Sequence, residues 1–138
     1  MSQLVEERQN IARRSDLKGS ERRALLSDAT DSWLRGLLTD AMTQHRADST
    51  QLALLAVGGY GRREMSLGSV IDVVLVHEPS ALRVEDVASS LWYPIWDSRI
   101  ALDHSVRTIA QARTLAQGDF KVVLGLIDAR VVAGSTEL

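Results

Sequence analysis

Residues 51–77 read QLALLAVGGYGRREMSLGSVIDVVLVH, and this stretch decides the fold. It holds two short apolar runs, at 51–57 and 70–76, on either side of a glycine-rich segment. Compact apolar runs of this length, the second rich in β-branched residues, are typical of buried strands. Asp72 is the single charge inside the second run. The stretch therefore predicts two buried strands joined by a glycine loop, with a carboxylate on the second strand.

Helical periodicity precedes these strands. Apolar residues recur with i, i+3, i+4 spacing over 20–46, which predicts a long amphipathic helix. Ser20, behind Gly19, is the expected N-cap of this helix. The more polar segment 2–15 predicts a shorter helix. The chain therefore begins with two helices before the first strand.

Three more elements follow the strands. An apolar stripe from residue 84 to 95 predicts a helix, which Pro94 kinks or ends near its last turn. Alternation over 99–107 predicts a third strand, and a stripe over 119–133 predicts a last helix that Gly134 stops. The predicted fold class is α+β (α/β), a small mixed sheet flanked by helices.

The composition of the chain excludes several classes of function. The chain has 138 residues, a net charge of −2 and no cysteine, which excludes disulfide scaffolds, thiol nucleophiles and Cys-ligated metals. A near-neutral balance argues against sequence-independent binding of nucleic acid, because such binding depends on phosphate neutralisation. No apolar run is long enough to span a bilayer, and the N-terminus lacks an apolar signal core. We expect a cytoplasmic protein that binds small ligands or protein partners, with no nucleic acid and no membrane.

The glycine loop is the candidate ligand site. Gly58, Gly59 and Gly61 let backbone N–H groups and phosphate oxygens approach where a Cβ would collide. The loop is not a P-loop, because no Gly-Lys-Ser/Thr follows, and it returns to a strand rather than opening a helix as a dinucleotide fingerprint does. Its alternative interpretation is a tight turn without a ligand.

Two blocks of sequence point to a family. The segment GGYGRRE at 58–64, followed by Gly68-Ser69-x-x-Asp72, resembles the DNA-polymerase-β-like nucleotidyltransferases. With LWYPIWD at 91–97 and LDHSVRT at 102–108, it is similar to the N-terminal nucleotidyltransferase domain of the bifunctional protein-PII uridylyltransferase/uridylyl-removing enzymes, in wording closest to their actinobacterial branch. The resemblance runs from about residue 52 to the C-terminus. We therefore expect a helical segment over 1–50 and a nucleotidyltransferase-like domain over 51–138, and the resemblance implies a longer family architecture around them.

The resemblance also implies an activity. Members of the family transfer UMP from UTP to a tyrosine of the PII nitrogen-regulatory protein and release pyrophosphate, with AMP from ATP as the alternative in the actinobacterial branch. The chemistry uses Mg²⁺ held by carboxylates. The expected metal ligands and catalytic residues are Asp72 and Asp103. The expected nucleotide-binding residues are Gly58, Gly59, Gly61, Arg62 and Ser69.

One position departs from the family pattern. The family has Gly-Ser-Asp-x-Asp, in which two carboxylates on one face of a strand share the metal ions. This chain has Val70 at the first carboxylate position, and valine offers no lone pair. Two hypotheses stay open: an active transferase domain, and a catalytically degenerate module that acts only in binding or regulation. Asp72 itself has an alternative interpretation, in which its carboxylate is paired structurally, for example with Arg62 or Arg107.

Overall fold

A four-stranded mixed sheet organises the protein. The computed structural model describes residues 3–63, 70–111 and 130–134. In the sheet the strand order is β3-β2-β1-β4. The elements in chain order are α1 (Gln3–Ala12), α2 (Gly19–His45), the 3₁₀ turn η1 (Ser49–Gln51), β1 (Leu52–Ala56), α3 (Gly58–Gly61), β2 (Ile71–His77), α4 (Val84–Asp97), β3 (Leu102–Thr108) and β4 (Arg130–Gly134). The predicted α+β class, with a small mixed sheet and flanking helices, is confirmed.

Both central strands are the predicted apolar runs. β1 pairs antiparallel with β2, so that Leu54 lies opposite Leu75, and antiparallel with β4 on its other side. β2 pairs in parallel with β3, and α4 makes the crossover between them. In this parallel register Asp72 is the partner of Asp103. The sheet therefore brings together two carboxylates that are far apart in the sequence.

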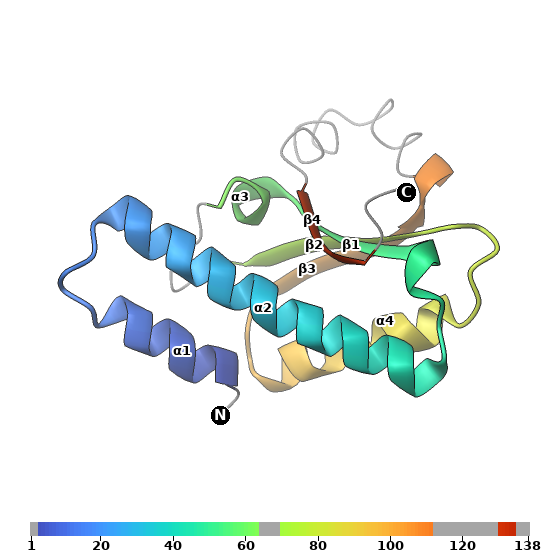
Figure 1. Ribbon diagram of the computed structural model, residues 1–138, viewed down its shortest axis with the longest axis horizontal. Coiled ribbons are helices and arrows are strands. Elements are labelled where there is room, and N and C mark those ends of the chain that lie inside the picture. The colour runs from blue at the N-terminus through green and yellow to red at the C-terminus, as the bar shows by residue number, and fades with distance from the viewer. Residues whose placement is uncertain (1–2, 64–69, 112–129, 135–138) are drawn as a thin grey trace.

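The helices cover one face of the sheet, on which the core forms (Figure 1). Alternate residues of β2, such as Ile71, Val73 and Leu75, are fully buried there among apolar side chains of α2 and α4. Asp72 lies between them in sequence and faces the other way. Because helices and sheet share one hydrophobic core, the described residues pack as one unit. A division of the chain at residue 50 stays a prediction.

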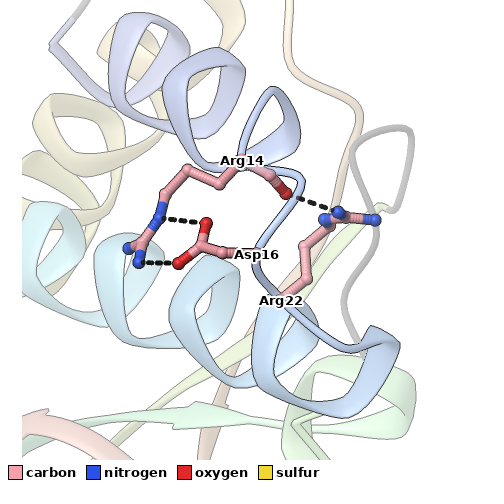
Figure 2. A network of polar contacts seen from close by, with 3 residues as sticks. All are labelled: Arg14, Asp16 and Arg22. Atoms are coloured by element: carbon pink, nitrogen blue, oxygen red, sulfur yellow. Dashed lines mark hydrogen bonds and ion pairs between the residues drawn. The ribbon is translucent and has the colours of Figure 1, made fainter.

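The turn between α1 and α2 is held by a small polar network. The Arg14 guanidinium donates to both carboxylate oxygens of Asp16, at 3.3 and 2.9 Å. Arg22, in the first turns of α2, donates to the Arg14 carbonyl oxygen at 2.7 Å (Figure 2). The Arg22 contact ties the start of α2 to the turn, and α1 packs Leu4 into the core.

The last predicted helix is wrong where the structure describes it. Residues 130–134, expected to be the end and stop of a helix over 119–133, form strand β4, and residues 119–129 lie outside the described residues. Val131 and Val132 fit a helical stripe and a strand equally well, and pairing with β1 decides for the strand. A hydrogen bond from Arg35 Nε of α2 to the Val132 carbonyl oxygen, at 2.6 Å, ties β4 to the helical layer.

Two smaller expectations also need correction. The N-cap of α2 is Lys18, in extended conformation, and Ser20 lies inside the helix, because the helix begins at Gly19. The glycine loop opens with one turn of helix, α3, rather than as irregular chain. The other prediction for a breaker is confirmed: Pro94 lies in the last turn of α4, which ends at Asp97. Within the described residues, no helix combines the length and apolarity needed to cross a bilayer.

Candidate nucleotide site

The glycine turn and Asp72 touch at one end of the sheet. β1 ends at Ala56, and the Val57 N–H then donates to the Asp72 carbonyl oxygen at 3.0 Å. Gly58 follows with φ +57°, in the left-handed region. A Cβ built on Gly58 would lie 2.7 Å from Asp72 Oδ2. The backbone conformation therefore favours glycine here, and a larger residue would displace the carboxylate that lies beside the Gly58 Cα.

Asp103 supplies a second carboxylate beside the first. Residues paired across neighbouring strands point to the same face, so both side chains lie on the face away from the helices. Asp72 is half-buried and Asp103 is exposed. Burial raises the pKa of Asp72 above its ordinary value of 3.8, and the Asp103 charge raises it further. The pair therefore concentrates negative charge that a cation would relieve.

Structural pairing of Asp72 with Arg107 finds no support in the register. Arg107 pairs with Val76, four positions along β3 from Asp103, and its Nη1 donates to the Val106 carbonyl oxygen at 3.3 Å. The charge that acts on the Asp72 carboxyl is that of Asp103. Arg62 follows the glycine turn and is exposed, and its pairing with Asp72 stays a prediction.

Two side chains anchor the turn to α2, and the sequence did not reveal them. Tyr60 is 1% exposed, and its hydroxyl donates to Asp31 Oδ1 at 2.5 Å. Arg63, on the far side of the turn, forms an ion pair with Asp28. Asp28 and Asp31 lie three residues apart and so share one face of the helix. The only signal in the sequence is their three-residue spacing on the predicted helix, which does not say what they bind.

The remaining predicted residues lie between β1 and β2 in the sequence. The Gly61 N–H donates to the Val57 carbonyl oxygen at 2.9 Å and so belongs to the turn itself. Val70 immediately precedes β2 and is 46% exposed. Ser69 lies outside the described residues, so its predicted role rests on the sequence. The part of Gly59 in nucleotide binding also stays a prediction.

A separate hollow lies on the opposite side of the sheet. It encloses about 670 Å³ between the start of α4 and the neighbouring strands, and its lining includes His77, Arg83, Trp92 and Val106. None of the predicted site residues lines it. The hollow is therefore distinct from the glycine turn and the two carboxylates.

Comparison with known proteins identifies the family. The family described as "Putative nucleotidyltransferase DUF294" matches residues 5–93, which include α2, the glycine turn, Asp72 and most of α4. The chain belongs to this nucleotidyltransferase family. The predicted family resemblance is thereby confirmed, and the match extends over most of the helical segment as well as over β1 and β2.

Relatives of this nucleotidyltransferase chain carry a more specific name. It is 49% identical, over 87% of its own length, to the bifunctional uridylyltransferase/uridylyl-removing enzyme of Streptomyces coelicolor, of which the match covers 14%. It is 40% identical, over 93% of its length, to the enzyme of the same name from Mycobacterium tuberculosis, with 16% of that protein covered. The chain thus spans about a seventh of the length of these curated relatives.

The donor set of the candidate site fits one divalent cation together with a nucleotide. Mg²⁺ is commonly held by one or two carboxylates, with phosphate oxygens and water completing the shell. Asp72 and Asp103 meet that requirement, and their mutual repulsion favours a shared cation. Among residues 3–63, 70–111 and 130–134, no three acidic or histidine side chains gather closely enough to hold a metal by themselves.

Proposed function

We propose that the chain is the nucleotide-binding part of a protein-PII nucleotidyltransferase, acting in the cytoplasm on UTP or ATP with Mg²⁺. The observation that carries the proposal is the contact between Gly58 and the Asp72 carboxylate, with Asp103 in register beside it. A glycine in the left-handed region beside a carboxylate leaves open space at the end of the sheet, and a phosphate with its cation would need that space. The names of the relatives favour uridylyl transfer within this class.

In the proposed reaction a tyrosine hydroxyl of the PII protein attacks the α-phosphorus of the nucleotide. The new bond joins the phenolic oxygen to phosphorus, the bond between the α-phosphorus and the bridging oxygen breaks, and pyrophosphate leaves while the phenolic proton passes to solvent. Bound Mg²⁺ supplies neutralisation of the triphosphate and of the leaving group. Asp72 and Asp103 hold the cation, and the turn at Gly58, Gly59 and Gly61 orients the phosphates. Arg62 and Ser69 are proposed as further phosphate contacts.

A second candidate function rests on Val70. Val70 immediately precedes β2, the strand that carries Asp72. Its exposed apolar side chain stands where the family pattern has a metal ligand. A module that binds nucleotide but transfers nothing, and that acts in regulation, agrees with this residue. Loss of one strong transition-state contact lowers rates by about 10²–10³-fold. The two candidates therefore differ in transfer rate far more than in nucleotide binding.

The test uses the chain and two variants of the same position. Val70→Asp adds the missing carboxylate, and Val70→Asn is the matched control with similar size and no charge. Because Val70 is 46% exposed, neither variant disturbs the core. UTP and ATP are titrated by calorimetry with and without Mg²⁺, and label transfer to the PII protein is measured with each nucleotide.

The outcomes separate the proposals. We expect the chain to bind UTP or ATP, and Val70→Asp to show stronger Mg²⁺-dependent binding and transfer raised about 10²–10³-fold over Val70→Asn. Measurable transfer by the unmodified chain supports the enzyme. Binding by the unmodified chain with transfer by Val70→Asp alone supports the regulatory module. If neither protein binds either nucleotide, the proposed function is wrong.

A further inference from the structure

The buried carboxylate of Asp31 has a specific partner in the glycine turn. Asp31 lies on α2 and is 4% exposed, and it accepts a 2.5 Å hydrogen bond from the Tyr60 hydroxyl. Acidic side chains are almost never buried to this degree unless they are paired. Tyr60 is the residue between Gly59 and Gly61, so the carboxylate holds the centre of the turn rather than its flank.

The Tyr60 hydrogen bond acts on the geometry of the candidate site. The turn is short, and its N–H groups at Gly61 and Arg62 donate to the carbonyl oxygens of Val57 and Gly58, at 2.9 and 3.1 Å. A displacement of Tyr60 therefore moves Gly58 as well. Since the Gly58 Cα lies against the Asp72 carboxylate, any such movement changes the space beside the proposed cation ligand.

A second anchor acts one helical turn earlier. Asp28 of α2 pairs with Arg63, which has a left-handed backbone at φ +60°. This ion pair is partly exposed, so it contributes less than the buried hydrogen bond. Together the two carboxylates hold the turn at its centre and at its end, from one face of α2.

From these contacts we infer that Asp31 is a positioning residue of the nucleotide site, which acts through Tyr60 to hold Gly58 at the distance from Asp72 that Mg²⁺–nucleotide binding requires. The inference rests on the proposed function, because it concerns the same site. It assigns a role in ligand binding to α2, which contributes no residue to the sequence motif of the family. Asp28, through Arg63, supports the same turn more weakly.

The test separates positioning from core stability. Tyr60→Phe removes only the hydroxyl, whereas Asp31→Asn keeps an oxygen that accepts the hydrogen bond. Thr30→Val is the matched control, because the Thr30 hydroxyl is also buried on α2 and donates to the Leu26 carbonyl oxygen at 2.8 Å, within the helix. Circular dichroism sets a temperature at which all variants are folded. At that temperature amide hydrogen exchange is measured without ligand, and Mg²⁺–UTP and Mg²⁺–ATP are titrated by calorimetry.

We expect Tyr60→Phe to speed exchange at Gly61 and Arg62 and to weaken nucleotide binding, each by about tenfold, as the loss of one buried hydrogen bond allows. Asp31→Asn keeps the acceptor, so its exchange rates and its nucleotide affinity should stay close to those of the unmodified chain. Thr30→Val should change neither the exchange rates nor the affinity. Exchange or binding in Tyr60→Phe that equals the unmodified chain overturns the inference. If the unmodified chain binds no nucleotide, the proposed function has failed, and faster exchange would then show the anchoring alone, without the role in binding.

A second pair of variants keeps the test decisive if Tyr60→Phe does not fold. Asp28→Ala removes the partner of Arg63 at an exposed position, and Asp16→Ala breaks the comparably exposed pair with Arg14 at the α1–α2 turn. We expect Asp28→Ala to weaken nucleotide binding by about two- to threefold, in the range of exposed ion pairs, and Asp16→Ala to leave it unchanged. Equal affinities for the two variants would count against anchoring by α2.

Discussion

Replacement of Gly58 by alanine tests the contact on which the site depends. The backbone at Gly58 has φ +57°, and a non-glycine residue in this conformation costs about 1–2 kcal/mol. The added Cβ would also lie 2.7 Å from Asp72 Oδ2. That oxygen is the free end of a side chain, so it can turn away at small cost in stability. The backbone term therefore sets the loss in stability, and the displaced carboxylate sets the loss in binding.

The expected magnitude can be measured directly. For a domain of this size, about 1–2 kcal/mol corresponds to a Tm lowered by about 3–7 °C. Gly36→Ala is the matched control: it lies exposed in the middle of α2, and nothing lies within 4 Å of its added Cβ. Because alanine is the better helix former by about 1 kcal/mol, the control should raise Tm.

Binding provides the second measurement on the same two variants. We expect Gly58→Ala to lose the part of the UTP or ATP affinity that depends on Mg²⁺, because its Cβ occupies the space of the Asp72 carboxylate. Gly36→Ala should bind as the unmodified chain does. Thermal unfolding by circular dichroism and calorimetric titration give the two quantities. An unchanged Mg²⁺ dependence in Gly58→Ala, or a Tm equal to that of the unmodified chain, would refute the reasoning.

Two further predictions concern stability. The pKa of Asp72 is raised by burial and by Asp103, so the protonated carboxyl is favoured by folding, and its contribution is fully present below about pH 3.9 and lost as the pH rises through the folded-state pKa. Asp72→Asn should therefore melt above the unmodified chain at pH 7 and approach it towards pH 3.5 in thermal scans; a lower Tm at pH 7 would contradict this. Gly134 has φ +89°, and a Cβ there would lie 2.3 Å from the Leu52 carbonyl oxygen, which is backbone and cannot turn aside. Gly134→Ala should lose more than about 2 kcal/mol in urea unfolding, and a loss smaller than that of Gly58→Ala would show that β4 shifts freely.

Local patterns in the sequence predict most of the described fold. The runs at 51–57 and 70–76 are β1 and β2 within a residue at each end, because short apolar runs next to glycine leave few alternatives. The segment 20–46 forms α2, because its apolar residues recur with the period of a helix. The sequence pattern predicts a helix at β4 because the valines there fit both periods, and the partner strand β1 lies far away in the sequence. Pairing between distant segments is the information that a local pattern does not contain.

The candidate site shows the same division. Asp72 is recognisable as a lone charge in an apolar strand, and Asp103 as a carboxylate in the next strand, and the structure places them in register. Their catalytic role stays a prediction. The contact between Asp31 and Tyr60 could not be predicted, because it depends on how α2 crosses the end of the sheet. Side chains that support a site from another element carry no motif of their own.

The position of β4 at the end of the sheet has a consequence for how the chain assembles. β1 and β2 are neighbours in sequence, whereas Ala53 finds its partner Gly134 more than half the chain away. Closing a long loop carries the larger entropic penalty, and such contacts slow folding. The hairpin of β1 and β2 can therefore form early with α2, while the docking of β4 against Leu52 comes late and limits the folding rate. During synthesis, the edge of β1 that pairs with β4 stays unpaired until β4 has left the ribosome.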